Sequence, residues 1–340
     1  DMNRGAKDGR IVRRAADDTT SDRKGARQRI AGITVSDDSR VMSHDRQVTA
    51  GVLDFLSRRL PGGKPFFLFA GFLAPHFPLT IPQSFADRYR GKVAMPRIPP
   101  GHLDRLPLNY KHLRYGFGLD AFDDPTTLRG REYYHGLTEW FDVELGKVLQ
   151  ALARSPFASN TVVIYTTDHG ENMGEHGLWW KNCLYEHAAH IPLVVNWPAR
   201  WKDGQRRRGA CAMVDVVQTI ADLGGARTPE DWNGRSLVKW MDNAASPWKD
   251  MAVSQYYAHN IASGYAMLRQ DRWKYVYHSA PDSRHPAERE LYDLTADPGE
   301  FTNLASHPDQ RSRIEQMHSA LIKELGEHPD ETEQRCRAET

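Results

Sequence analysis

The first part of the chain shows a helical and then an extended pattern of apolar residues. Segment 47–59 carries apolar residues at helical spacing, at Val48, Val52, Phe55 and Leu56, which predicts an amphipathic helix. Pro61-Gly62-Gly63 should end it. Residues 65–73 then form an unbroken apolar run of strand length, which is typical of a strand buried on both faces of a sheet.

The same alternation continues after a long excursion. Residues 79–127 are rich in Pro, Gly and Tyr and are predicted to form local turns. A long amphipathic helix should follow over 128–154, and segments 161–167 and 191–197 are apolar runs that indicate two further buried strands. Strands that alternate with long helices predict an α/β fold, with a mostly parallel sheet sandwiched by helices.

The pattern changes beyond Gly224-Gly225. Residues 252–278 alternate around Tyr, Trp and Val, as antiparallel strands do, and 308–325 should be a closing helix. We therefore expect three regions. These are an irregular segment over 1–40, an α/β core over 41–235, and a smaller C-terminal α+β subdomain over 236–340 with an antiparallel sheet and a helix.

Composition narrows the class of protein. The chain has 45 Lys and Arg against 44 Asp and Glu, so its charge favours neither nucleic acid nor an anionic membrane as a partner. No apolar run reaches the ~20 residues that span a bilayer. Three scattered cysteines form no CxxC pair, so they do not decide between a periplasmic, secreted or cytoplasmic location. We expect a globular protein with a substantial core.

Chemically versatile side chains follow the predicted strand 161–167 directly. Asp168 and His169 leave it side by side, and ligands of open parallel sheets gather at the carboxyl ends of strands. Glycines at 170, 174 and 177 would let the backbone bend closely around this point, and Lys181 could return a positive charge to it. A turn capped by the aspartate explains Asp168-His169 alone equally well. The glycines and Lys181 favour a site for a cation and an anion.

Another histidine follows the first predicted strand. His76 lies in Ala74-Pro75-His76-Phe77-Pro78, where the prolines stiffen the loop at the same edge of the sheet. Taken alone, such a histidine is more often structural. Beside Asp168, it could donate a proton to the leaving oxygen of an ester. His187 and His190 do not form a zinc-protease motif, because no Glu lies between them, and we expect them to be structural or surface residues.

Several segments together resemble the sulfatase family of the alkaline-phosphatase superfamily. Asp168-His169-Gly170-Glu171, with residues 174–181 and 191–194, is similar to the family's second signature. Pro75-His76-Phe77-Pro78 resembles its histidine motif, 214–220 its Val-Asp-x-x-Pro-Thr helix start, and 290–304 its C-terminal signature. The resemblance covers roughly residues 45–325 and extends to choline-sulfatase-like and iduronate-sulfatase-like members.

The resemblance implies a cation and a sulfate at this site. Sulfatases hold one divalent cation, usually Ca²⁺, among acidic side chains, an Asn or His, and a hydrated formylglycine. Asp168 and His169 would thus be metal ligands for Ca²⁺, with Mg²⁺ or Mn²⁺ as alternatives. Lys181 would be catalytic and substrate-binding through contact with the sulfate, and His76 would be catalytic at the leaving oxygen. His176 is a weaker candidate for substrate contact.

The departures from the family are as informative as the matches. Formylglycine is made within a Cys/Ser-x-Pro-Ser-Arg motif, and these 340 residues contain no such motif. The doublets Asp17-Asp18, Asp37-Asp38 and Asp123-Asp124 are expected to be loop acids and not the family's metal-binding pair. The family's N-terminal third is therefore expected to be missing, which would leave a sheet edge unpaired and the chain inactive alone.

Three functions remain open at this stage. The first is hydrolysis of a small-molecule or saccharide sulfate ester. The second is hydrolysis of a phosphonate monoester or phosphodiester, which would use the same Asp-His pair and lysine. The third is a non-catalytic relic or binding module. A homo-oligomer is compatible with the sequence, which does not decide it.

Overall fold

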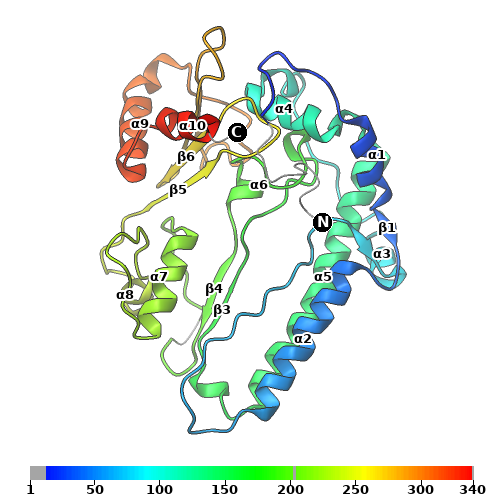
Figure 1. Cartoon of the computed structure of the whole chain (residues 1–340), viewed down its shortest axis with the longest axis vertical. Helices are drawn as coiled ribbons and strands as arrows, with labels where there is room; N and C mark the ends of the chain where they lie inside the picture. The colour runs from blue at the N-terminus through cyan, green and yellow to red at the C-terminus, as the bar shows by residue number, and fades with distance from the viewer. Residues whose placement is uncertain (1–12, 202–203, 339–340) are drawn as a thin grey trace.

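Two long helices form one side of the molecule in the computed structural model, which describes residues 13–201 and 204–338 (Figure 1). Helix α2, Arg40–Arg58, begins at Ser39, whose hydroxyl accepts the Met42 N–H, and α5, Asp124–Arg154, begins at Asp123. Both predicted helices are confirmed. A buried hydrogen bond of 2.8 Å from the Thr49 hydroxyl to the Glu144 carboxylate joins them.

The N-terminal segment is more regular than the sequence predicts. Residues Arg23–Ala31 form helix α1, capped by Asp22, and β1, Thr34–Val35, pairs in parallel with β2, Thr80–Ile81. The expectation of an irregular segment over 1–40 is wrong for this part, and residues 1–12 lie outside the described residues. Helix α1 buries little besides Ala26, so it leaves no apolar periodicity in the sequence.

The excursion over 79–127 contains helices as well as turns. Helix α3 spans Gln83–Tyr89 and α4 spans Leu108–Phe117, with short 3-10 turns at Leu103–Arg105 and Leu119–Ala121. Among the described residues, no helix is both long and apolar enough to cross a membrane.

Two of the three predicted central strands form, with an unexpected direction. Strand β3, Val163–Thr166, follows the 3-10 turn Ala158–Asn160 and pairs with β4, Leu193–Asn196, in antiparallel register. The predicted parallel direction is wrong for this pair. Parallel neighbours need a crossover, whereas residues 167–192 fold back through the 3-10 turn Glu175–Gly177 and the short helix α6, Glu186–Ala189.

The third predicted strand, 65–73, does not form. Among residues 13–201 and 204–338, no backbone-to-backbone hydrogen bond involves 65–72, and Phe67 and Phe69 are 70% and 81% exposed. The run passes as an irregular trace between the β3–β4 pair and α2 in the view of Figure 1. An apolar run becomes a strand only when neighbouring strands pair with its backbone, and the described residues supply none.

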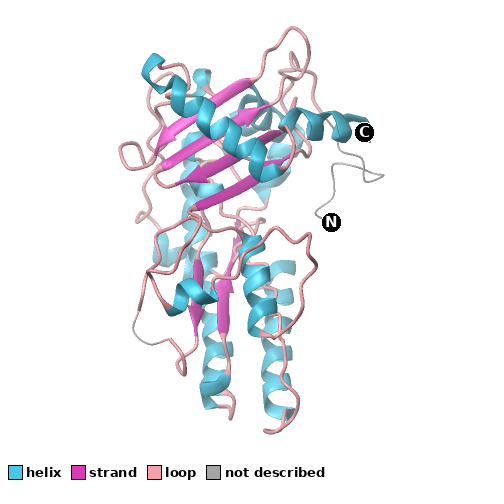
Figure 2. Ribbon diagram, turned by 90° about the vertical axis from the view of Figure 1, so that its left-hand side faces the viewer, coloured by secondary structure: helices cyan, strands magenta, loops and turns pink. Residues whose placement is uncertain are grey.

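A four-stranded antiparallel sheet forms the C-terminal subdomain, as predicted (Figure 2). Its order is β5-β6-β7-β8, with the strands Met251–Tyr256, Tyr265–Gln270, Trp273–His278 and Glu288–Asp293. Helix α9, Arg311–Leu325, covers one face, and α10, Pro329–Ala338, follows it. Helices α7, Met213–Leu223, and α8, Val238–Asp242, precede the sheet.

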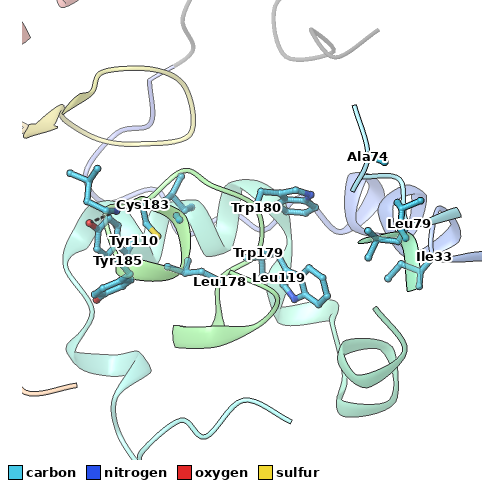
Figure 3. Close-up of a cluster of buried hydrophobic side chains, with 14 of the residues drawn as sticks. Ile33, Ala74, Leu79, Tyr110, Leu119, Leu178, Trp179, Trp180, Cys183 and Tyr185 are labelled. Carbon is cyan, nitrogen blue, oxygen red and sulfur yellow. Dashed lines mark hydrogen bonds between the residues drawn. The ribbon is translucent and has the colours of Figure 1, made fainter. Parts of the chain in front are cut away.

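The main hydrophobic core lies between the N-terminal helices and the C-terminal sheet. The loop after β3 contributes Leu178, Trp179, Trp180 and Cys183, which pack with residues of α4 and of the segment around Leu79 (Figure 3). Tyr265 and Val276 of the C-terminal sheet join the same cluster, whereas Tyr275 faces α9 in a second cluster. The loop after β3 is therefore packed between the C-terminal sheet and the helices of the N-terminal part.

Candidate functional site

Asp168 and His169 leave the carboxyl end of β3, as predicted. The Asp168 side chain is 81% exposed, and its Oδ2 lies 3.4 Å from Nε2 of His169. Nδ1 of His169 lies 2.8 Å from the carbonyl oxygen of Gly170. A carbonyl only accepts, so Nδ1 donates to it and Nε2 faces Asp168. Histidines that bind metals are held in this way.

The start of the loop that carries His76 is held by a carboxylate on helix α2. Asp45 is fully buried and accepts hydrogen bonds from the backbone N–H groups of Leu73 and Ala74, at 2.7 and 2.9 Å. Burial raises the pKa of Asp45 despite these bonds. The peptide bonds before Pro75 and Pro78 are cis. Sequence reasoning missed Asp45; the signal was an acid one and two helical turns before the buried Thr49 and Val52.

Lys181 reaches His76 directly. Its Nζ donates a 3.0 Å hydrogen bond to Nε2 of His76, whose Nδ1 donates to the Phe77 carbonyl at 2.6 Å. Burial lowers the pKa of both side chains, and the positive charge of Lys181 lowers that of His76 further. The ring centroids of His76 and His169 are 6.2 Å apart. The structure thus brings His76, His169, Asp168 and Lys181 to one end of β3.

The loop that returns Lys181 is organised around Glu171. Its Oε1 accepts hydrogen bonds from the N–H groups of Met173 and Trp180, at 3.1 and 2.5 Å. Burial raises the pKa of Glu171 to about 7, against the opposing effect of these bonds. A side chain at Gly170 would collide with the His187 carbonyl, so this glycine is required for close approach. Sequence analysis noted Glu171 within the motif but assigned it no role.

His176 does not lie in this cluster. Its imidazole is fully buried, stacks on Tyr185 with ring centroids 3.7 Å apart, and bonds to Nε2 of His102 at 2.9 Å. Burial lowers its pKa to about 3. The expected substrate contact of His176 is thus corrected to a core role, because the ring has no exposed edge. His190 lies on the surface, as expected, and pairs with Glu186 at 3.1 Å.

The donors that are present fit half of a cation site. Asp168 supplies an exposed oxygen and His169 a free nitrogen, but the described residues contain no group of three or more His, Cys, Asp or Glu side chains that could hold a metal. A hard cation such as Ca²⁺ takes six to eight oxygen ligands, so these two side chains are insufficient alone. Asp17, Asp37 and Asp38 are exposed in loops, as expected, whereas Asp123 caps α5 and Asp124 is its first residue, so the loop expectation is wrong for Asp124.

Comparison with known proteins decides the family. Residues 13–226 match the family described as "Sulfatase", and residues 174–327 match "N-sulphoglucosamine sulphohydrolase, C-terminal". The chain belongs to the sulfatase family. The predicted resemblance is therefore confirmed, over both the α/β core and the C-terminal subdomain.

Curated sulfatases are similar over most of this chain. An arylsulfatase of Clostridium perfringens is 26% identical over 276 residues, which are 80% of this chain and 56% of the relative. Human arylsulfatase K is 31% identical over 311 residues, which are 83% of this chain and 56% of that protein. The chain thus spans just over half the length of these two relatives.

Solved structures confirm the fold of this sulfatase chain. A phosphonate monoester hydrolase of Agrobacterium radiobacter superposes with a TM-score of 0.71 at 22% identity, over 83% of this chain and 60% of the other. A protein solved in complex with its substrate D-glucosamine-2-N,6-O-disulfate superposes with a TM-score of 0.69 at 19% identity, over 85% of this chain and 71% of the other. The predicted α/β fold with a C-terminal sheet subdomain is confirmed.

Proposed function

We propose that this chain forms part of a hydrolase of sulfate esters, with Lys181 and His76 acting on the ester. The observation that carries the proposal is the 3.0 Å contact between Lys181 Nζ and His76 Nε2 beside the Asp168–His169 pair. An ammonium group here would stabilise negative charge on the sulfate oxygens in the transition state. The family match and the arylsulfatase relatives support a sulfate ester as substrate.

The hydrogen bond also offers a route for a proton. Neutral His76 accepts at Nε2 from the Lys181 ammonium, and burial lowers the pKa of both side chains. An amine is a stronger base than an imidazole, so the proton stays on Nζ until negative charge develops on the leaving oxygen, which would then draw it from Nζ by way of Nε2. Lys181 and His76 would thus together protonate the alcohol that leaves the ester.

We further propose that Asp168 and His169 are two ligands of a divalent cation, for which Ca²⁺ is the first choice and Mg²⁺ or Mn²⁺ the alternatives. When bound, such a cation would polarise the ester oxygens. The remaining ligands and the formylglycine nucleophile have to come from residues outside these 340, since the chain lacks the Cys/Ser-x-Pro-Ser-Arg motif. We expect the chain alone to be inactive.

A sulfated saccharide is the substrate class that we favour. Residues 174–327 match the C-terminal region of N-sulphoglucosamine sulphohydrolase, and one structural neighbour was solved with a disulfated glucosamine. A phosphonate monoester or phosphodiester is the second candidate, because a lysine, a histidine and a carboxylate suit any tetrahedral oxyanion ester.

Paired substrates on matched variants test this function. The chain joined to a segment carrying the nucleophile motif would be assayed with an aryl sulfate and an aryl phosphodiester. Lys181→Ala should lower kcat/KM for the sulfate by about 10²–10³, as loss of an oxyanion donor does. His307→Ala, on the exposed surface of the C-terminal subdomain, should leave it unchanged. Preference for the phosphodiester would favour the second candidate, and no effect of Lys181→Ala on either substrate would refute the assignment.

A further inference from the structure

A lysine of the C-terminal sheet is completely buried beside the loop that follows Lys181. Lys274 lies on β7, an inner strand, with 0% of its side chain exposed. Its Nζ lies 2.6 Å from Oε1 of Glu186, 2.7 Å from Oε1 of Glu300 and 2.9 Å from the Leu184 carbonyl. One ammonium group is therefore held between two carboxylates and a backbone oxygen.

Stability alone explains this arrangement poorly. Taking an ion pair out of water costs several kcal/mol per ion, and apolar residues of similar size often stabilise a protein as well or better. Glu300 is 1% exposed and has a left-handed backbone with φ of 55°, which is unusual for a residue other than glycine. Burial raises the pKa of Glu300 to about 7, whereas Glu186, held by His190 and Lys274, has its pKa lowered to about 2.

The cluster of Lys274, Glu186 and Glu300 bonds the segment directly after Lys181. Glu300 Oε2 accepts the backbone N–H of Glu186 at 2.6 Å, and the Asn182 side chain donates to the Tyr256 hydroxyl at 2.6 Å. The Tyr265 hydroxyl donates to the Asn182 carbonyl. Side chains of the C-terminal subdomain thus fix residues 182–186 at several points.

The other side of Lys181 is fixed from within the α/β core. The N–H of Trp180 is bonded to Glu171, and Trp180 has a left-handed backbone with φ of 62°. Residues on both sides of Lys181 are therefore fixed. Glu171 holds Trp180 before it, and after it Tyr256 and Tyr265 hold Asn182 while the Lys274 cluster holds residues 184–186.

We propose that Lys274 is a positioning residue, which holds Lys181 against His76 through Glu186 and Glu300 and so makes the C-terminal subdomain a structural part of the site. The consequence for ester hydrolysis rests on the proposed function, but the positioning does not. It can be tested on the 340-residue chain without any activity.

The test separates positioning from stability. Lys274→Met leaves the buried Glu300 carboxylate without its cation, whereas the partly exposed Glu186 keeps its pair with His190. Lys274→Met/Glu300→Gln removes one charge of each sign and should recover most of the unfolding midpoint. Leu321→Ala, in the core on the far side of the sheet, is the matched control for lost stability. In 15N-histidine-labelled chains at one fixed pH, the Nε2 resonance of His76 reports whether it still accepts a hydrogen bond. Lys181→Met gives the position of that resonance without the donor.

The double variant should move the His76 Nε2 resonance to its position in Lys181→Met, and Leu321→Ala should leave it at the wild-type position. A folded double variant with the wild-type resonance would overturn the proposal. Should the double variant not fold, Glu186→Ala, which removes the side-chain oxygen that Lys274 contacts, is read in the same way, and an unchanged resonance again refutes the role of Lys274. Failure of the ester assay with a positive result here would refute the function but not the positioning.

Discussion

At the scale of single residues, burial controls the chemistry of this chain. Glu171 and His176 are only five positions apart, yet burial moves the pKa of one up and of the other down, because in each case it disfavours the charged form. The two side chains therefore make folding depend on pH in opposite directions. Each gives a separate prediction.

Glu171 should make the chain less stable as the pH rises. Its folded pKa of about 7 exceeds the ordinary value of 4.5, so its contribution is complete below pH 4.5 and is lost as the pH rises through 7. Glu171→Gln keeps the accepting oxygen. Its free energy of unfolding relative to the wild type should therefore increase between pH 5 and pH 8, by at most about 3 kcal/mol. Urea unfolding at both pH values measures this gain. The exposed Glu230→Gln should show none, and parallel pH curves for Glu171→Gln would contradict the prediction.

His176 should make the chain less stable in acid. Its folded pKa of about 3 lies below the ordinary 6.5, so its contribution is complete above pH 6.5 and is lost as the pH falls toward 3. His176→Phe keeps the stacking on Tyr185 and should remove up to about 2 kcal/mol of the loss between pH 7 and 5. The unfolding midpoints at these pH values, with the exposed His307→Phe as the surface control, test this prediction. Equal slopes in all three proteins would argue against it.

At the scale of elements, helix α2 positions the loop that carries His76. The Asp45 carboxylate satisfies two backbone N–H groups, so Asp45→Ala should leave both unpaired and cost about 3 kcal/mol. Asp54→Ala, on the exposed side of the same helix, removes only a surface pair with Arg58 and should cost less than about 1 kcal/mol. Denaturant unfolding compares the two. Similar losses of unfolding free energy in both variants would show that Asp45 does not hold the loop that carries His76.

At the scale of the whole molecule, part of the apolar run 65–72 is exposed, although Phe66 contacts Phe55 and Phe157 and Phe72 packs against the core. Phe67 and Phe69 are largely exposed, and the backbone around them makes no strand pairing within the described ranges. Exposed apolar surface and unpaired backbone favour association between chains.

Polar substitution of this run should improve solubility without loss of stability. Phe67→Ser/Phe69→Ser should reduce binding of an apolar dye and aggregation, while the unfolding midpoint changes little. Phe72→Ser is the matched control: Phe72 packs against the core and lies 5.3 Å from the Phe141 ring, so its loss should destabilise by about 3 kcal/mol. Light scattering and thermal unfolding separate the two effects, and destabilisation by the double variant would show that the run is packed.

The sequence by itself determined the family, the long helices, the C-terminal sheet and the cluster of His76, Asp168, His169 and Lys181. These features depend on local periodicity and on motifs whose residues lie near strand ends. Tertiary structure alone decided that 65–73 stays unpaired, that β4 runs antiparallel to β3, and that His176 belongs to the core. It also decided which backbone groups the buried Asp45, Glu171 and Lys274 side chains bond. Strand pairing and burial are set by neighbours distant in the chain, and no local pattern records which neighbours are present.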